Sequence, residues 1–177
     1  MDERFIPECY RNPVIILGCG NILFGDDGFG PSVVEYILKN YIIPENVSVI
    51  DAGTSVREIL FNIVLNERRP EKIIIIDAVD TGRQPGEIFE LSIDELPDNK
   101  IDDFSFHQFP TSNLLKELQQ FCNVEVIIVA AQVKNIPEEI CPGLSEQLID
   151  AIPGTCGIIL KKITNLDYSQ DKSIRLK

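Results

Sequence analysis

The chain has 177 residues, of which 44% are hydrophobic and 25% are charged, as in a globular protein with one sizeable core. Its formal net charge of −12 argues against broad contact with a nucleic-acid backbone and suits solubility or a basic protein partner. Its apolar runs are too short to cross a bilayer, and residues 1–12 lack the features of a secretory signal. We therefore expect one cytoplasmic domain over residues 1–177, with an N-terminal arm (1–12) and a polar, frayed C-terminal tail (164–177).

Apolar periodicity predicts strands and helices in alternation along the chain. The expected strands are 14–17, 46–51, 72–76, 87–91 and 124–131, and the expected helices are 31–40, 56–65, 111–121 and 145–160. Pro153 and Gly154 leave the middle of the last helix undecided.

Two strands indicate how the sheet is built. Segment 72–76 contains four consecutive isoleucines, which is typical of a central strand covered by helices on both faces. Segment 87–91 alternates charged and apolar residues after a link too short for a helical crossover, so we expect an antiparallel edge strand. The fold class is therefore α/β: a three-layer α/β/α sandwich whose mostly parallel, twisted sheet has about five strands and one antiparallel edge strand.

A glycine-rich loop with two acids follows the first expected strand, in the stretch VIILGCGNILFGDDGFGP from Val14 to Pro31. Ligands of parallel α/β sheets bind where such loops leave the strands, so we place the active cleft here. A dinucleotide fingerprint would require glycine where Leu23 stands, and no phosphate-loop lysine is present. Asp26 and Asp27 would also repel a pyrophosphate, although the helix dipole alone would favour acids at this position.

A metal site is one interpretation of the polar residues near this cleft. Asp27 follows the first strand, Asp77 ends the third strand, and His107, the only histidine, lies in the long segment 92–110. Two carboxylates and an imidazole suit nickel, zinc, manganese or iron, and three protein ligands leave positions open for substrate. An ordinary polar histidine and a helix-capping role for Asp77 remain open, because Asp51 ends the second strand in the same way.

Nucleophilic catalysis has weaker support. No serine lies in a G-x-S-x-G elbow, and a Cys19–His107 pair lacks a local signature. The five cysteines include no CxxC pair, so neither a zinc ribbon nor a disulfide framework is expected. We interpret Cys19 as structural.

Four segments carry a resemblance to a known family. GCGNILFGDDGFGP resembles the motif G-x-G-N-x-L-x-x-D-[DE]-G-x-G of the hydrogenase maturation endopeptidases. DAVDTGRQPGEI and SFHQFP are similar to that family's second and third segments, and DAGT resembles its D-G-G-T stretch with Ala52 in place of a glycine. The match is collinear from about residue 14 to residue 160. The stretch FGDDGFG is similar to the motif of the family branch that serves coenzyme F420-reducing hydrogenases.

The resemblance implies an aspartyl-type endopeptidase that removes the C-terminal extension from the large-subunit precursor of a [NiFe] hydrogenase after nickel insertion. By position, the residues that are both catalytic and metal-contacting would be Asp27, Asp77 and His107, whereas Asp26 would shape the loop. Nickel would be supplied by the precursor, so no stored cofactor is expected, and the partner would be that precursor.

Three further expectations accompany this interpretation. Asn21 and residues 53–55 are predicted to line the peptide groove. A neutral His107 predicts that cleavage declines below about pH 6. Two rival functions remain: a non-catalytic sensor of nickel occupancy in the precursor, which would bind metal through the same residues, and a small-molecule α/β hydrolase or nucleosidase with an anionic cleft, which would need no protein partner.

Overall fold

The structure is a computed structural model and describes residues 8–93, 112–164 and 175–176. At its centre is a five-stranded sheet of order β3-β1-β4-β6-β5. The strands are β1 (Val14–Cys19), β3 (Val47–Gly53), β4 (Lys72–Val79), β5 (Ile88–Leu91) and β6 (Glu125–Gln132). All pairings in this sheet are parallel except that of β5 with β6. The predicted central strand and the predicted antiparallel edge strand are both confirmed.

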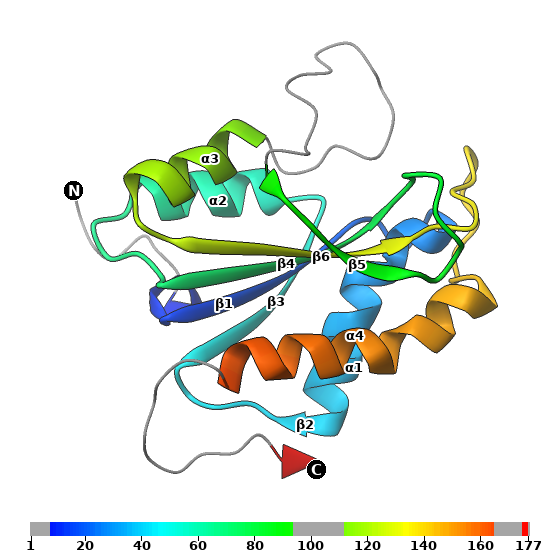
Figure 1. Cartoon of the computed structure of the whole chain (residues 1–177), viewed down its shortest axis with the longest axis horizontal. Coiled ribbons are helices and arrows are strands. Elements are labelled where there is room, and N and C mark those ends of the chain that lie inside the picture. The colour runs from blue at the N-terminus through cyan, green and yellow to red at the C-terminus, as the bar shows by residue number, and fades with distance from the viewer. Residues whose placement is uncertain (1–7, 94–111, 165–174, 177) are drawn as a thin grey trace.

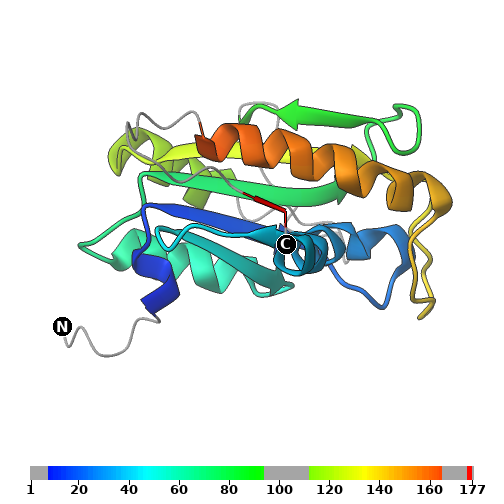
Figure 2. The ribbon, with the colours of Figure 1, turned by 90° about the horizontal axis from the view of Figure 1, so that it is seen from below.

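Two helices cover each face of this sheet (Figure 1). Helices α2 (Val56–Leu65) and α3 (Ser112–Phe121) lie on one face, and α1 (Phe29–Asn40) and α4 (Glu146–Thr164) lie on the other, as the view in Figure 2 also shows. Alternate residues of β1 enter opposite cores: Ile16 packs with α1 and α4, and Ile15 packs with α2 and α3. The predicted three-layer sandwich is therefore confirmed.

Helix α4 is continuous through Pro153, where the sequence left the structure undecided. Proline removes one helical hydrogen bond, at a cost of about 3 kcal/mol in a helix interior. Leu148, Cys156 and Ile159 are nevertheless fully buried against the sheet. Burying each such side chain contributes about 1.5–3 kcal/mol, so the apolar face of the helix outweighs the lost bond.

Short described segments of the N-terminal arm and the C-terminal tail form secondary structure. Residues 175–176 form strand β7 (Arg175–Leu176), which pairs antiparallel with β2 (Tyr41–Ile42), so a wholly frayed tail is wrong for these two residues. In the arm, residues 8–11 form a 3₁₀ helix, η2 (Glu8–Arg11), and Tyr10 packs against the core. The correction to the tail comes from a pairing between segments far apart in the sequence. No helix in the described part of the chain has the length and apolar character needed to cross a membrane.

Candidate active site

The loops that follow β1, β4 and β6 gather at the carboxyl edge of the sheet (Figure 1). Gly18 of β1 lies opposite Ile76 of β4 in the parallel ladder. Cys19 and Asp77 are therefore the next residues on two neighbouring strands. The 3₁₀ turn η3 (Gly25–Gly28), which contains both acids of the glycine-rich loop, leads directly into α1.

The first turn of α1 rests on the backbone of β1 and β4. A Cβ atom on Gly30 would overlap the backbone of Cys19 and lie 2.6 Å from the carbonyl oxygen of Ile76. A Cβ on Gly18 would in turn overlap the carbonyl oxygen of Gly30. Only glycine permits this separation, so these two motif positions set how closely η3 approaches the strand ends.

Asp26 ties the glycine-rich loop to the β6–α4 connection. Its side chain is 1% exposed, and its Oδ2 accepts hydrogen bonds from Lys134 N (2.8 Å), Asn135 N (3.1 Å) and Ser145 Oγ (3.0 Å). Its Oδ1 accepts a fourth bond from Ser145 N at 2.7 Å. One carboxylate thus holds both ends of the 134–145 connection, which confirms the expectation that Asp26 shapes the loop.

Asp27, the next residue, faces the inside of its own loop. It is 3% exposed, and its Oδ2 accepts a hydrogen bond from Asn21 N at 2.8 Å. Gly20 has a φ of +119°, and a Cβ there would overlap the carbonyl oxygen of Asp27. The backbone of residues 20–21 is therefore folded closely around this acid, and it orients the Asp27 carboxylate at the sheet edge.

Asp77 lies at the same edge, near the end of β4. It is 8% exposed, and its Oδ1 accepts a hydrogen bond from the backbone N of Ala78 at 2.8 Å. Asp51 lies near the end of β3, but its side chain is exposed and accepts a bond from Gly53 N at 3.0 Å. Both acids were expected to end their strands, yet each strand continues for two more residues, and burial distinguishes Asp77 from Asp51.

The Cys19 thiol shows that these carboxylates share one neighbourhood. Burial raises the pKa of Cys19 well above its usual value, and the negative charges of Asp77, Asp51 and Asp27 raise it further. The thiol is 2% exposed and lies 4.0 Å from the carbonyl oxygen of Leu17, to which it donates. A buried, protonated thiol is a poor nucleophile, so the structural role predicted for Cys19 is favoured over catalysis by a cysteine–histidine pair.

Two of the three predicted site residues are thus placed at one edge of the sheet. His107 lies outside the described residues, so its position relative to Asp27 and Asp77 stays a prediction. Within the described ranges, no three His, Cys, Asp or Glu side chains are grouped closely enough to hold a metal ion. The two carboxylates do supply the hard oxygen ligands of the predicted set.

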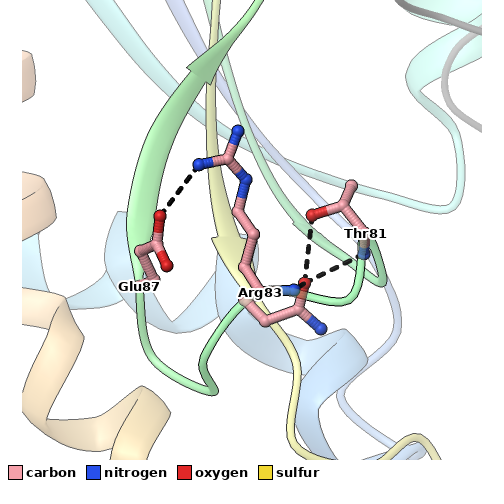
Figure 3. Close-up of polar contacts among 4 residues, drawn as sticks. Thr81, Arg83 and Glu87 are labelled. Atoms are coloured by element: carbon pink, nitrogen blue, oxygen red, sulfur yellow. Dashed lines mark hydrogen bonds and ion pairs between the residues drawn. The ribbon is translucent and has the colours of Figure 1, made fainter.

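Sequence reasoning missed Gln132, which organises the turn after β4. Its side chain is 3% exposed, and its Oε1 accepts hydrogen bonds from Thr81 N (2.9 Å), Thr81 Oγ1 (3.1 Å) and Arg83 N (3.1 Å) (Figure 3). Its Nε2 donates to Asp80 Oδ1 and to Val133 O, both at 3.0 Å. A glutamine directly after the apolar run of residues 126–131 was the available signal.

Arg83 extends from this turn over β5. Its Nη1 lies 2.8 Å from Glu87 Oε1, as Figure 3 shows, and its guanidinium lies 4.1 Å from the centre of the Phe89 ring. Both ends of the Arg83–Glu87 pair are partly exposed, so the pair itself adds little stability. Its main effect is to hold the arginine in one orientation beside the β4–β5 turn.

The sequence and the fold both match one family. The family model of the hydrogenase maturation proteases, HycI, matches residues 31–162, and the chain belongs to this family. The matched span begins after the loop that carries Asp26 and Asp27, so the roles of these acids rest on the loop motif and geometry.

Individual relatives agree with this assignment. The chain is 40% identical over 154 residues to a Methanocaldococcus jannaschii protein named as a candidate hydrogenase maturation protease, covering 86% of this chain and 97% of that one. It is 33% identical over 158 residues to the delta subunit of the coenzyme F420 hydrogenase of Methanothermobacter thermautotrophicus, covering 87% and 96%. Among solved structures, the maturating endopeptidase HybD from E. coli superposes with a TM-score of 0.71 at 26% identity, covering 87% and 93%.

Proposed function

We propose that this protein is an endopeptidase that removes the C-terminal extension of a [NiFe] hydrogenase large-subunit precursor after nickel has been inserted. One observation carries the proposal: on the fold of this family, two carboxylates are buried at the carboxyl edge of adjacent parallel strands, Asp27 in the loop that follows β1 and Asp77 near the end of β4. Buried carboxylates at the carboxyl edge of a parallel sheet suit a functional site, and a cation carried by the substrate would offset the cost of burying their charge.

Each acid has an orienting partner in the backbone. Asn21 N donates to Asp27, and Ala78 N donates to Asp77. Carboxylates held in this way are pre-oriented ligands for a cation brought in by the substrate. In our proposal the nickel of the precursor meets Asp27, Asp77 and His107, and it acts there as a Lewis acid on the scissile carbonyl or on a bound water.

Delivery of the metal by the substrate makes cleavage conditional on nickel insertion. A precursor without nickel would bring no cation to the acids, and its carbonyl would not be polarised. This arrangement needs no stored cofactor, and it would prevent the C-terminus from being released before the metal centre is complete.

The peptide groove is proposed to run beside Asn21 and residues 53–55. Gly20 N donates a hydrogen bond to Gly53 O at 3.1 Å, so the β1–α1 loop and the loop after β3 are in direct contact. Asn21 also accepts a bond from Leu23 N at 3.0 Å, which gives this segment a defined turn. Both contacts support a preformed wall next to Asp27.

The client is proposed to be the large-subunit precursor of a coenzyme F420-reducing hydrogenase. The FGDDGFG stretch and the 33% identity to the F420 hydrogenase delta subunit support this choice. We place the reaction in the cytoplasm, with no nucleic acid or membrane involved.

A cleavage assay with that precursor tests the proposal. The precursor, nickel-loaded or nickel-free, is mixed with the protein, and intact mass spectrometry follows loss of the C-terminal peptide. We expect loss only from the loaded form, abolished by Asp27→Asn and Asp77→Asn and retained by Asp150→Asn, which removes an exposed acid on α4. Stable binding without any mass change would instead identify a non-catalytic sensor, and unchanged cleavage by Asn21→Ala would contradict the proposed groove.

A further inference from the structure

Three large apolar side chains are exposed beside the candidate active site. Ile22 is 59% exposed, Leu23 is 42% exposed and Ile140 is 69% exposed. We call these three residues the rim patch. Two belong to the β1–α1 loop, and the third belongs to the connection between β6 and α4. Each would lose apolar surface to a partner that covered it.

Hydrogen bonds hold the two parts of the rim patch together. Cys141 N donates to Leu23 O at 2.9 Å, and Gly25 N donates to Cys141 O at 2.9 Å, so Phe24 and Cys141 form a parallel β-bridge. The residues before this bridge, Leu23 and Ile140, are therefore neighbours in register. A surface fixed in this way binds without a large cost of ordering its loops.

The rim patch adjoins the loop that holds Asp27 in the candidate active site. Ile22 directly follows Asn21, whose backbone N holds the Asp27 carboxylate at 2.8 Å. A Cβ on Gly28 would lie 3.0 Å from the Cα of Ile22, so the loop folds back over the start of α1. A polypeptide that reached Asp27 along this loop would pass over the rim patch.

The charges beside the rim patch indicate what kind of peptide segment would bind there. Glu138 and Glu139 are exposed and precede Ile140 directly. The whole chain carries a formal charge of −12. An apolar segment flanked by basic side chains would therefore be attracted to this surface, whereas an acidic segment would be repelled.

We propose that the rim patch is the docking surface for an apolar segment of the hydrogenase large-subunit precursor that is flanked by basic residues. This inference rests on the proposed function, because it assigns the precursor as the occupant. The docked segment holds the precursor against the β1–α1 loop, so the C-terminal extension is aligned with Asp27 while the apolar side chains are removed from water.

Binding and turnover of the nickel-loaded precursor test this assignment separately. The patch variant is Leu23→Ser/Ile140→Ser. The matched control is Ile42→Ser, which removes a 55% exposed isoleucine from β2, at the far end of α1. We expect the patch variant to weaken binding to immobilised precursor and to raise KM by about tenfold or more, with kcat within about twofold of wild type. The control should keep both constants within about twofold.

Several outcomes overturn the inference without touching the proposed function. Cleavage with unchanged KM and binding in the patch variant would exclude docking at this surface. So would equal losses in the Ile42→Ser control, or a homodimer that the patch substitutions dissociate, since a second copy would then be the occupant. Conversely, wild-type protein that binds the precursor through the patch but never cleaves it would refute the endopeptidase and leave the docking surface intact.

The charge argument has its own variant. Glu138→Gln/Glu139→Gln removes both acids beside Ile140 while keeping the side-chain shape. We expect slower association with the precursor and a weaker dependence of that rate on salt. Faster association in this variant would show that the docked segment is not basic and would overturn that part of the inference. Urea unfolding curves, measured for every variant, verify that each one is folded at the assay temperature.

Discussion

Replacing Asp26 should loosen the carboxyl edge of the sheet without removing a proposed catalytic group. Asp26→Ala deletes the acceptor of four hydrogen bonds, three of which come from backbone N atoms of Lys134, Asn135 and Ser145. A hydrogen bond to a charged group contributes about 1.5–3 kcal/mol. The donor residues are themselves partly or fully exposed, so water replaces some of the lost bonds. We therefore expect a loss of about 3 kcal/mol in the free energy of unfolding.

Asp26→Asn separates the charge from the geometry. The amide keeps one oxygen acceptor, but its NH₂ group would face N–H or O–H donors where the second carboxylate oxygen now accepts. We expect a loss of about 2 kcal/mol, smaller than that of the alanine variant. Both variants should also weaken precursor binding, because the 134–145 connection carries Ile140 of the rim patch.

Urea unfolding followed by circular dichroism measures these losses. For a chain of this size, 3 kcal/mol corresponds to a fall in the melting temperature of roughly 6–12 °C. Asp150→Asn, an exposed acid on α4, controls for the change in net charge. If Asp26→Ala lies within about 0.5 kcal/mol of that control, the four hydrogen bonds do not hold the loops together and our reasoning is wrong.

Three further predictions follow from the same edge. Because burial and neighbouring carboxylates raise the pKa of Cys19, its thiol should stay protonated at pH 8. Iodoacetamide should therefore label the exposed Cys141 but not Cys19 in the folded protein. Peptide mapping measures the labelling, and a labelled Cys19 would contradict the prediction. Gly30→Ala should lower the free energy of unfolding by about 2–4 kcal/mol because its Cβ would overlap the Cys19 backbone. Gly157→Ala on α4 has open space around it and should leave the free energy of unfolding unchanged or raise it. Equal urea midpoints for the two variants would contradict this packing. Cleavage should decline below about pH 6 as His107 gains a proton, and a flat rate down to about pH 5 would exclude a histidine ligand.

The sequence by itself determined the class of fold and indicated the region of the candidate site, because these depend on local patterns. Four consecutive isoleucines require burial on both faces, which placed β4 at the centre of the sheet. The short link after β4 excluded a helical crossover, which made β5 antiparallel. Asp27 and Asp77 were singled out because one follows β1 and the other lies near the end of β4, and the carboxyl ends of these parallel strands meet at one edge.

Only the tertiary structure decided what each polar group does there. Asp26 and Asp27 are adjacent in sequence and both buried, yet Asp26 binds residues more than 100 positions away while Asp27 binds its own loop. The partners of Gln132 lie about 50 positions before it, and strand β7 pairs with β2 from the other end of the chain. No local pattern encodes such partners, because a hydrogen bond across the fold depends on which loops the packed sheet brings together.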